Sequence, residues 1–301
     1  MVNLDKYKDE FKKFITKFFS DKDIKIYLYS NNFDSIYKDL ERWNYSLITG
    51  IPNQYLITMF TEFLMRQDID PLDYLTYVPK NYLSYSSYVK QILIPDNIQQ
   101  VFCKAFCDCY NLQRVIIGNN VQTIAEEAFE YCKNLETVVI GDNTTIIEYE
   151  AFHKCTSLQT VNLGKRVTGV GDSAFDGCIS LTNIDLSNVT NIGGTAFWGC
   201  SSLSDINLHG VSHIGKFAFA ECWSLSSIDL SNVTSIGEGA FNFCRSLKSI
   251  TIDKNAKILK KYLFYKCDSL ETIIFNGSKE EWPKYAPAWI IRQNLKVICK
   301  G

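Results

Sequence analysis

Cysteine and histidine are the residue types in this chain with the widest chemistry, because their side chains ligate metals and act as nucleophiles or bases. The sequence holds 11 Cys and 3 His. Eight of the Cys recur at one position of a repeating pattern: Cys109, Cys132, Cys155, Cys178, Cys200, Cys222, Cys244 and Cys267. A residue type that recurs once per period stacks on itself, and a free Cys packs as a small buried hydrophobe. The spacing therefore predicts reduced, structural thiols.

A zinc site is the alternative use of cysteine. Zinc ligands come as Cys-x-x-Cys pairs that converge from two loops, but the close set Cys103, Cys107 and Cys109 has no matching second pair. The three His are His153, His209 and His213. None of them lies in an H-E-x-x-H motif, and the sequence contains no G-x-S-x-G motif and no glycine-rich phosphate loop. We therefore predict no metal, no cofactor and no catalytic residues.

Short polar side chains in the middle of the chain are a third candidate. In each strand of the form L-x-x-V-x-I the Leu, Val and Ile face the core, so the residues two and four after the Leu face outward on a concave sheet. This pattern predicts a partner-binding face made of Thr160, Asn162, Asn183, Asp185, Asp205, Asn207, Ser227 and Asp229. Stacked carboxylates repel one another and would attract a basic partner or a hard cation. The alternative is a solvated surface that keeps the sheet soluble.

A repeat of 22 or 23 residues must position all of these side chains. Its Phe falls at Phe106, Phe129, Phe152, Phe175, Phe197, Phe219, Phe241 and Phe264, and a Cys follows three residues after each Phe. A period in the low twenties with this strand signature predicts a solenoid, in which each unit buries its apolar face against its neighbours.

The boundaries of the solenoid follow from the same period. Adding 23 to Val78 and Leu83 gives Val101 and Phe106, so the solenoid begins near residue 78 and occupies residues 76–277. We expect a Gly-prone turn and a short helical AF-x-x-C piece between strands. The expected strands are 92–94, 115–117, 138–140, 161–163, 184–186, 206–208, 228–230, 250–252 and 273–275.

Residues 1–75 lie outside the period and predict a small helical domain that covers the open end of the solenoid. Apolar residues recur at helical spacing in 4–18, 34–43 and 53–66, and a short strand is conceivable at 24–28. A membrane-surface helix is the alternative for 4–19. Asp70 and Pro71 end the third helix, and PLDYL starts a short one.

The other end and the overall charge complete the picture. Residues 278–301 hold two Pro and two Trp and then the strand-like LKVICKG, which predicts a C-terminal cap. The net charge of −2 and a pI near 6.0 give no basic footprint for nucleic acid or an anionic membrane. The first residues form neither a secretory apolar region nor a membrane span. We expect a cytoplasmic protein, or a surface or secreted one if a leader has been removed.

The motif AF-x-x-C-x-x-L-x-x-V/I-x-I/L, followed by V-x-x-I-x-x-x-AF, resembles the BspA-like leucine-rich repeat. The ending NGSKEEW…VIC is similar to the terminal unit commonly seen in that family. The resemblance covers residues 78–301. It implies a right-handed parallel solenoid used for protein binding, often in bacterial or protozoan surface adhesins, with similar intracellular and phage-borne members. No catalytic residues come with this family.

The fold class that we predict is α+β, with a right-handed leucine-rich-repeat solenoid and a parallel concave sheet after a small helical domain. The predicted function is a non-enzymatic scaffold that binds a protein partner through the concave face. The alternative is a structural component of a virion or surface assembly, in which the helical domain docks and the solenoid is a spacer. An enzyme with its chemistry in the helical domain is the third class.

Overall fold

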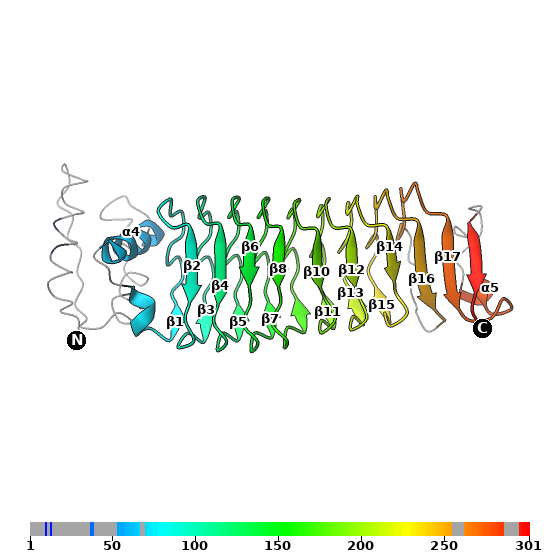
Figure 1. Ribbon diagram of the computed structural model, residues 1–301, viewed down its shortest axis with the longest axis horizontal. Coiled ribbons are helices and arrows are strands. Elements are labelled where there is room, and N and C mark those ends of the chain that lie inside the picture. The colour runs from blue at the N-terminus through cyan, green and yellow to red at the C-terminus, as the bar shows by residue number, and fades with distance from the viewer. Residues whose placement is uncertain are drawn as a thin grey trace.

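The computed structural model describes residues 53–66, 70–254, 262–285 and 295–301, together with Glu10, Lys13, Tyr37 and Lys38. In this part of the chain, parallel strands stack side by side along one long axis (Figure 1). They form two rows, and in the described residues each turn from β1 to β15 contributes one strand to each row. Helix content is small. The chain is therefore a parallel β-solenoid, as the period predicts.

The first row consists of the longer strands. From β2 to β12 and from β14 to β17, each strand pairs with the next one 22 or 23 residues later, for example Thr137 with Thr160 and Asn183 with Asp205. Every one of these strands begins one residue before its expected start, so the sequence placed them correctly. Their bounds are β2 (Gln91–Ile94), β4 (Arg114–Ile117), β6 (Thr137–Val139), β8 (Thr160–Asn162), β10 (Asn183–Asp185), β12 (Asp205–Asn207), β14 (Ser227–Asp229), β16 (Ser249–Asp253) and β17 (Thr272–Asn276).

The second row is an eight-stranded sheet of two-residue strands that the sequence did not predict. Each strand ends on a buried Val or Ile and packs against the inner face of the first row. Two residues are too few to show the alternation that marks a strand. The strands are β1 (Tyr77–Val78), β3 (Gln100–Val101), β5 (Thr123–Ile124), β7 (Ile146–Ile147), β9 (Gly169–Val170), β11 (Asn191–Ile192), β13 (His213–Ile214) and β15 (Ser235–Ile236).

The row of longer strands is interrupted once in the described residues. A six-stranded sheet runs from β2 to β12, and a four-stranded sheet begins at β14. The second row continues across this point, because β13 pairs with β15. Phe197 and Phe219 also remain stacked there, with ring centroids 5.1 Å apart. The interruption is therefore confined to one face of the solenoid.

The core is a column of stacked Phe rings beside a column of thiols. Consecutive rings from Phe106 to Phe264 lie 5.0 to 5.9 Å apart, and those of Phe129 and Phe152 are tilted by 2°. From Cys132 onward, each ladder thiol donates to the carbonyl of the Phe in the preceding turn, as Cys132 does to Phe106 at 3.0 Å; Cys109 donates to the carbonyl of Leu83 instead. Burial raises the pKa of the Cys178 and Cys222 thiols. Seven of the eight ladder thiols are buried and Cys267 is half-buried, which agrees with the predicted packing of these thiols in the core.

The AF-x-x-C segment is not helical, so that expectation was wrong. It is a run of turns in which two residues per repeat adopt a positive φ, one two residues before the Phe and one two residues after it. In one repeat these are Glu127 (φ 57°) and Tyr131 (φ 56°), and in another the second position is Gly177. A left-handed residue cannot propagate an α-helix. The sequence does not indicate these left-handed positions, because most of them are occupied by residues other than Gly.

Helical residues contact the first turn of the solenoid, where the Thr58 hydroxyl donates to the carbonyls of Asn81 and Ser84. The expected third helix is α4 (Asn53–Met65), and PLDYL forms the 3-10 helix η1 (Pro71–Tyr74) behind the N-cap Asp70. Tyr37 is fully buried, and its ring lies 5.9 Å from Phe60 and 5.8 Å from Tyr82 of the first turn. The rest of the helices expected at 4–18 and 34–43, and the possible strand at 24–28, lies outside the described residues.

The C-terminal end carries the expected last strand. β18 (Lys296–Cys299) pairs with β17, and the short helix α5 (Trp282–Tyr285) precedes it in the chain. Trp282 packs against Phe275 with ring centroids 5.3 Å apart. In the described residues, no helix is both long and apolar enough to cross a membrane.

Candidate functional site

All eight residues of the predicted binding face are exposed on the longer strands. In each of β8, β10, β12 and β14 the middle residue is buried and the two outer residues face solvent. The outer residues form two lines of side chains along the sheet. The first line holds Thr160, Asn183, Asp205 and Ser227, and the second line holds Asn162, Asp185, Asn207 and Asp229.

The register changes the expected electrostatics of this face. Asn183 pairs with Asp205, and Asp185 pairs with Asn207, so neither carboxylate has another carboxylate as its register partner. Asp229 lies beyond the interruption and pairs with Thr251. The expectation that carboxylates stack directly on one another was therefore wrong. Each charge has a neutral side chain beside it, which weakens the repulsion.

Three of the predicted residues also hold their own turns. Oδ1 of Asp185 accepts the backbone N–H of Ser187 at 3.0 Å, and Oδ1 of Asp229 accepts that of Ser231 at 2.9 Å. Oδ1 of Asn207 does the same for the residue two positions later, at 3.0 Å. These are Asx turns, and they occur where the repeat is 22 residues long. Asp185, Asn207 and Asp229, in the second line of side chains, thus have a structural role besides any role in binding.

In 23-residue repeats, glycine occupies the corresponding turn. A Cβ on Gly141 would lie 2.3 Å from the carbonyl oxygen of Gly118, and one on Gly164 would lie 2.0 Å from that of Gly141. Successive turns therefore approach too closely there for any side chain. The change from glycine to an Asx turn accounts for the Asp or Asn at Asp185, Asn207 and Asp229.

A polar cavity of about 310 Å³ opens where β12 and β14 are not paired. Asn207 and Asp229 line it, so the structure brings two of the predicted residues to its wall. His209, Ser231 and Asn232 complete its polar lining, and Nδ2 of Asn232 donates to the carbonyl of His209 at 2.8 Å. No residue pattern indicates this cavity, because the strands on either side follow the same pattern as the others.

A second cavity of about 310 Å³ lies among the AF-x-x-C turns. Its apolar walls include Trp198, Phe217 and Phe243, and Glu221 and Asn242 supply acceptors. The Oδ1 atom of Asn242 is buried and has no hydrogen-bond partner. Trp198 and Phe217 are exposed, and the ammonium of Lys154 lies 5.9 Å from the Trp198 ring.

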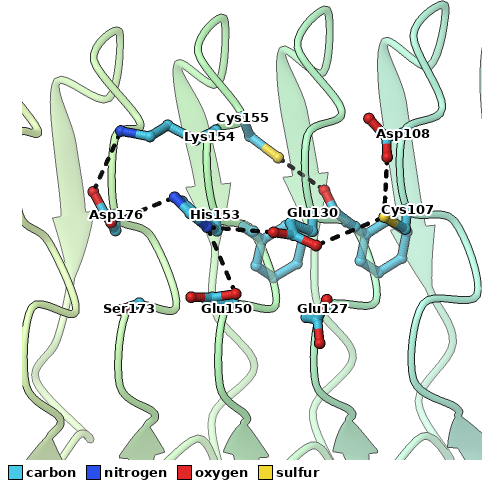
Figure 2. Close-up of polar contacts among 12 residues, drawn as sticks. Cys107, Asp108, Glu127, Glu130, Glu150, His153, Lys154, Cys155, Ser173 and Asp176 are labelled. Atoms are coloured by element: carbon cyan, nitrogen blue, oxygen red, sulfur yellow. Dashed lines mark hydrogen bonds and ion pairs between the residues drawn. The ribbon is translucent and has the colours of Figure 1, made fainter.

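A cluster of titratable side chains lies on the AF-x-x-C turns of earlier repeats (Figure 2). His153 lies between Glu130 and Asp176, which occupy the same position of the neighbouring turns, and Glu150 approaches from the same loop. Burial raises the pKa of the Glu130 and Asp176 carboxyls, and the interaction with Glu130 raises the pKa of His153. Glu130, Glu150 and His153 could together hold a metal ion.

Sequence reasoning missed this cluster although its signal is present. Cys107, Glu130, His153 and Asp176 each follow the repeat Phe by one residue, so one period separates each from the next. A position whose residues are all titratable but differ in type carries the same spatial information.

The fold and the repeat define a leucine-rich-repeat solenoid, a class of protein whose extended surfaces are used for binding. More particularly, this chain belongs to the family of the BspA type leucine-rich repeat region, whose model matches residues 76–204 and 168–288 with 6 copies of the repeat. The resemblance of the AF-x-x-C motif to that family is thereby confirmed. Proteins of this family and fold are generally non-enzymatic binding scaffolds.

Solved structures of other leucine-rich-repeat proteins are similar to this chain. A leucine-rich repeat protein of T. pallidum is similar at 30% identity and a TM-score of 0.51, over 55% of this chain and 80% of that chain. One from Bacteroides ovatus has 22% identity and a TM-score of 0.40, over 70% and 66%. A leucine-rich cell surface protein from Faecalibacterium prausnitzii has 21% and 0.33, over 71% and 80%. A search of curated proteins finds no match.

Proposed function

We propose that this protein is a non-enzymatic scaffold that binds a protein partner through the exposed face of the longer strands. The observation that carries the proposal is the two exposed lines of polar side chains on β8, β10, β12 and β14. They meet a polar cavity where β12 and β14 are not paired. Binding sites are typically concave and present a few convergent polar groups. The N-terminal residues 1–75 would serve as a capping domain and residues 278–301 as a second cap.

The charge of this face favours a basic partner. Asp185, Asp205 and Asp229 are exposed, and the strands β8 to β14 contain no Lys or Arg. The hydrogen bonds of Asp185 and Asp229 described above all use Oδ1, which leaves Oδ2 for a ligand. A partner that presents Lys or Arg would gain long-range attraction and a faster encounter. Ile116 and Val139, nearer the N-terminal end of the same face, would add apolar contact.

The test replaces Asp185, Asp205 and Asp229 with Asn together. Asn keeps an oxygen acceptor for the Asx turns, so the fold should be preserved. A partner captured from host lysate by the wild-type chain should associate with the triple variant more slowly, by roughly tenfold at low salt. The difference should shrink as salt rises, because screening removes the steering from both chains. Association rates measured at two salt concentrations give this comparison.

The matched control removes the same charge elsewhere. Glu126, Glu148 and Glu238 follow strands of the second row, and changing all three to Gln alters the net charge equally. This control should retain the wild-type association rate. Equal rates for both variants, with unchanged affinity, would move recognition off the sheet. The alternative of a structural component that docks through residues 1–75 would then be favoured.

A further inference from the structure

We propose that Glu130, Glu150 and His153 form a binding site for one divalent transition-metal ion such as Zn²⁺, on the turn side of the solenoid. These three side chains offer three ligand atoms that lie within 4.8 Å of one another. They come from two neighbouring AF-x-x-C turns, and Figure 2 shows both carboxylates directed at the same ring nitrogen of His153. The site is separate from the sheet face that carries the proposed function.

The spacing of the ligand atoms suits a tetrahedral ion. Nδ1 of His153 is 3.5 Å from Oε1 of Glu130 and 3.7 Å from Oε2 of Glu150. An ion bound at about 2.0 to 2.2 Å places tetrahedral ligands about 3.3 to 3.6 Å apart. A direct hydrogen bond would draw these atoms to about 2.9 Å. The observed separations are therefore closer to those of ligands around a metal than to those of a hydrogen-bonded pair.

The ring nitrogen at the centre is buried and lacks a hydrogen bond. Nδ1 of His153 has no hydrogen-bond partner in the described residues, although it is shielded from solvent. Buried polar atoms are nearly always paired, so such an atom calls for a ligand. The other nitrogen, Nε2, lies 3.4 Å from Oδ2 of Asp176. A carboxylate behind a ligating imidazole is the usual arrangement in metal sites, where it fixes the ring orientation.

A bound dication would balance the charges of the cluster. Glu130, Glu150 and Asp176 bring three negative charges, and the Lys154 ammonium lies 3.8 Å from Asp176 and contributes one positive charge. Lys104, one turn away, forms an ion pair with the Glu127 carboxylate at 2.8 Å. With all three carboxyls ionised, even a protonated imidazole would leave the cluster negative. A divalent ion with neutral His153 brings the total to zero, which offsets the cost of burying Glu130 and Asp176.

The backbone holds the ligands in place before any ion binds. Glu150 (φ 53°) and Lys154 (φ 57°) flank His153 in fixed left-handed turns. The backbone N–H of Tyr131 donates to the backbone carbonyl of His153 at 2.8 Å. The backbone N–H of Lys154 donates to the backbone carbonyl of Asp176 at 2.7 Å. One nitrogen and two carboxylate oxygens match the preference of zinc and its neighbours, whereas Ca²⁺ needs six to eight oxygens.

The experiment titrates Zn²⁺ into the full-length protein after chelator treatment, in a Cys103→Ser, Cys299→Ser background that removes the more accessible thiols. We expect one ion per chain by calorimetry, and Co²⁺ in its place should give visible absorption bands of a low-coordinate site. His153→Ala and Glu150→Gln should each weaken Zn²⁺ binding by at least about tenfold. His213→Ala, which removes an exposed His on β13 outside both sites, should bind as the background does.

Two results would overturn the proposal. One is the absence of stoichiometric Zn²⁺ binding in the background protein, which would mean that protons alone compensate the cluster. The other is unchanged binding after Glu150→Gln, which leaves a nearly identical side-chain shape and should fold normally. Circular dichroism of each variant checks the fold, so a loss of binding in a folded variant supports the site. The proposed sheet-face function is unaffected by either outcome.

Discussion

The Phe column gives the sharpest prediction about stability. Phe175 is fully buried, and its ring stacks at 5.3 Å on both Phe152 and Phe197. Truncating a buried Phe to Ala typically costs about 3 to 5 kcal/mol. Each stacked pair is worth about 0.5 to 1.5 kcal/mol beyond area burial, and Phe175→Ala removes two. We therefore expect a loss in the upper part of that range, near 4 to 5 kcal/mol.

The assay is equilibrium urea unfolding followed by circular dichroism. With a slope of about 3 kcal/mol per molar urea, this loss lowers the midpoint by roughly 1.5 M. Ile179→Ala is the matched control, because Ile179 lies in the same repeat but is 48% exposed. It should cost less than about 0.5 kcal/mol. Hydrogen exchange should also accelerate in the turns of Phe152 and Phe197, since neighbouring units share the column.

A loss below about 2 kcal/mol for Phe175→Ala would refute the reasoning. So would a midpoint equal to that of the Ile179→Ala control. Either result would mean that the column contributes little beyond filling space, and that the backbone ladders carry the stability of the solenoid.

The other predictions concern the thiols and the glycines. Because burial raises the pKa of Cys178 and Cys222, thiol reagents at pH 8 should modify Cys103 well before either of them. Unfolded thiols lose their protons above about pH 9 and the folded ones keep theirs, so the free energy of unfolding should fall there by up to about 1.4 kcal/mol per pH unit for each thiol; a urea midpoint that stays flat from pH 9 to 10 would contradict this. Gly164→Ala places a Cβ 2.0 Å from a backbone oxygen and should cost about 1 to 3 kcal/mol or more. Gly199→Ala has open space around it and should cost only about 1 kcal/mol, from its positive φ; equal urea midpoints for the two glycine variants would disprove the close approach of the turns at Gly164.

The sequence predicted what repeats in residue type. The Phe and Cys positions, the longer strands and the start of the solenoid near Val78 all follow from one period, because identical side chains in successive turns stack on one another. The helix at Asn53–Met65 follows from its apolar spacing. These features depend on local pattern and on nearest neighbours, which a single sequence displays directly.

Features that depend on particular pairs of side chains were not predicted. Glu130 and His153 share a repeat position but not a residue type, so the period alone does not single them out. The left-handed turn residues, such as Tyr131, are mostly not Gly and give no local signal. The Asx turns at Asp185 and Asp229 look in the sequence like free surface charges. No residue in β12 or β14 explains why these two strands are not paired.

The two kinds of turn have a consequence for how such chains change length over evolutionary time. A turn held by glycine and a turn held by Asp or Asn differ by one residue, yet both return the backbone to the same Phe and Cys columns. Unequal exchange between gene segments that encode whole repeats would therefore join a 22-residue unit to a 23-residue unit without shifting either column. The number of units, and with it the length of the surface offered to a partner, is free to vary while the two ends stay the same.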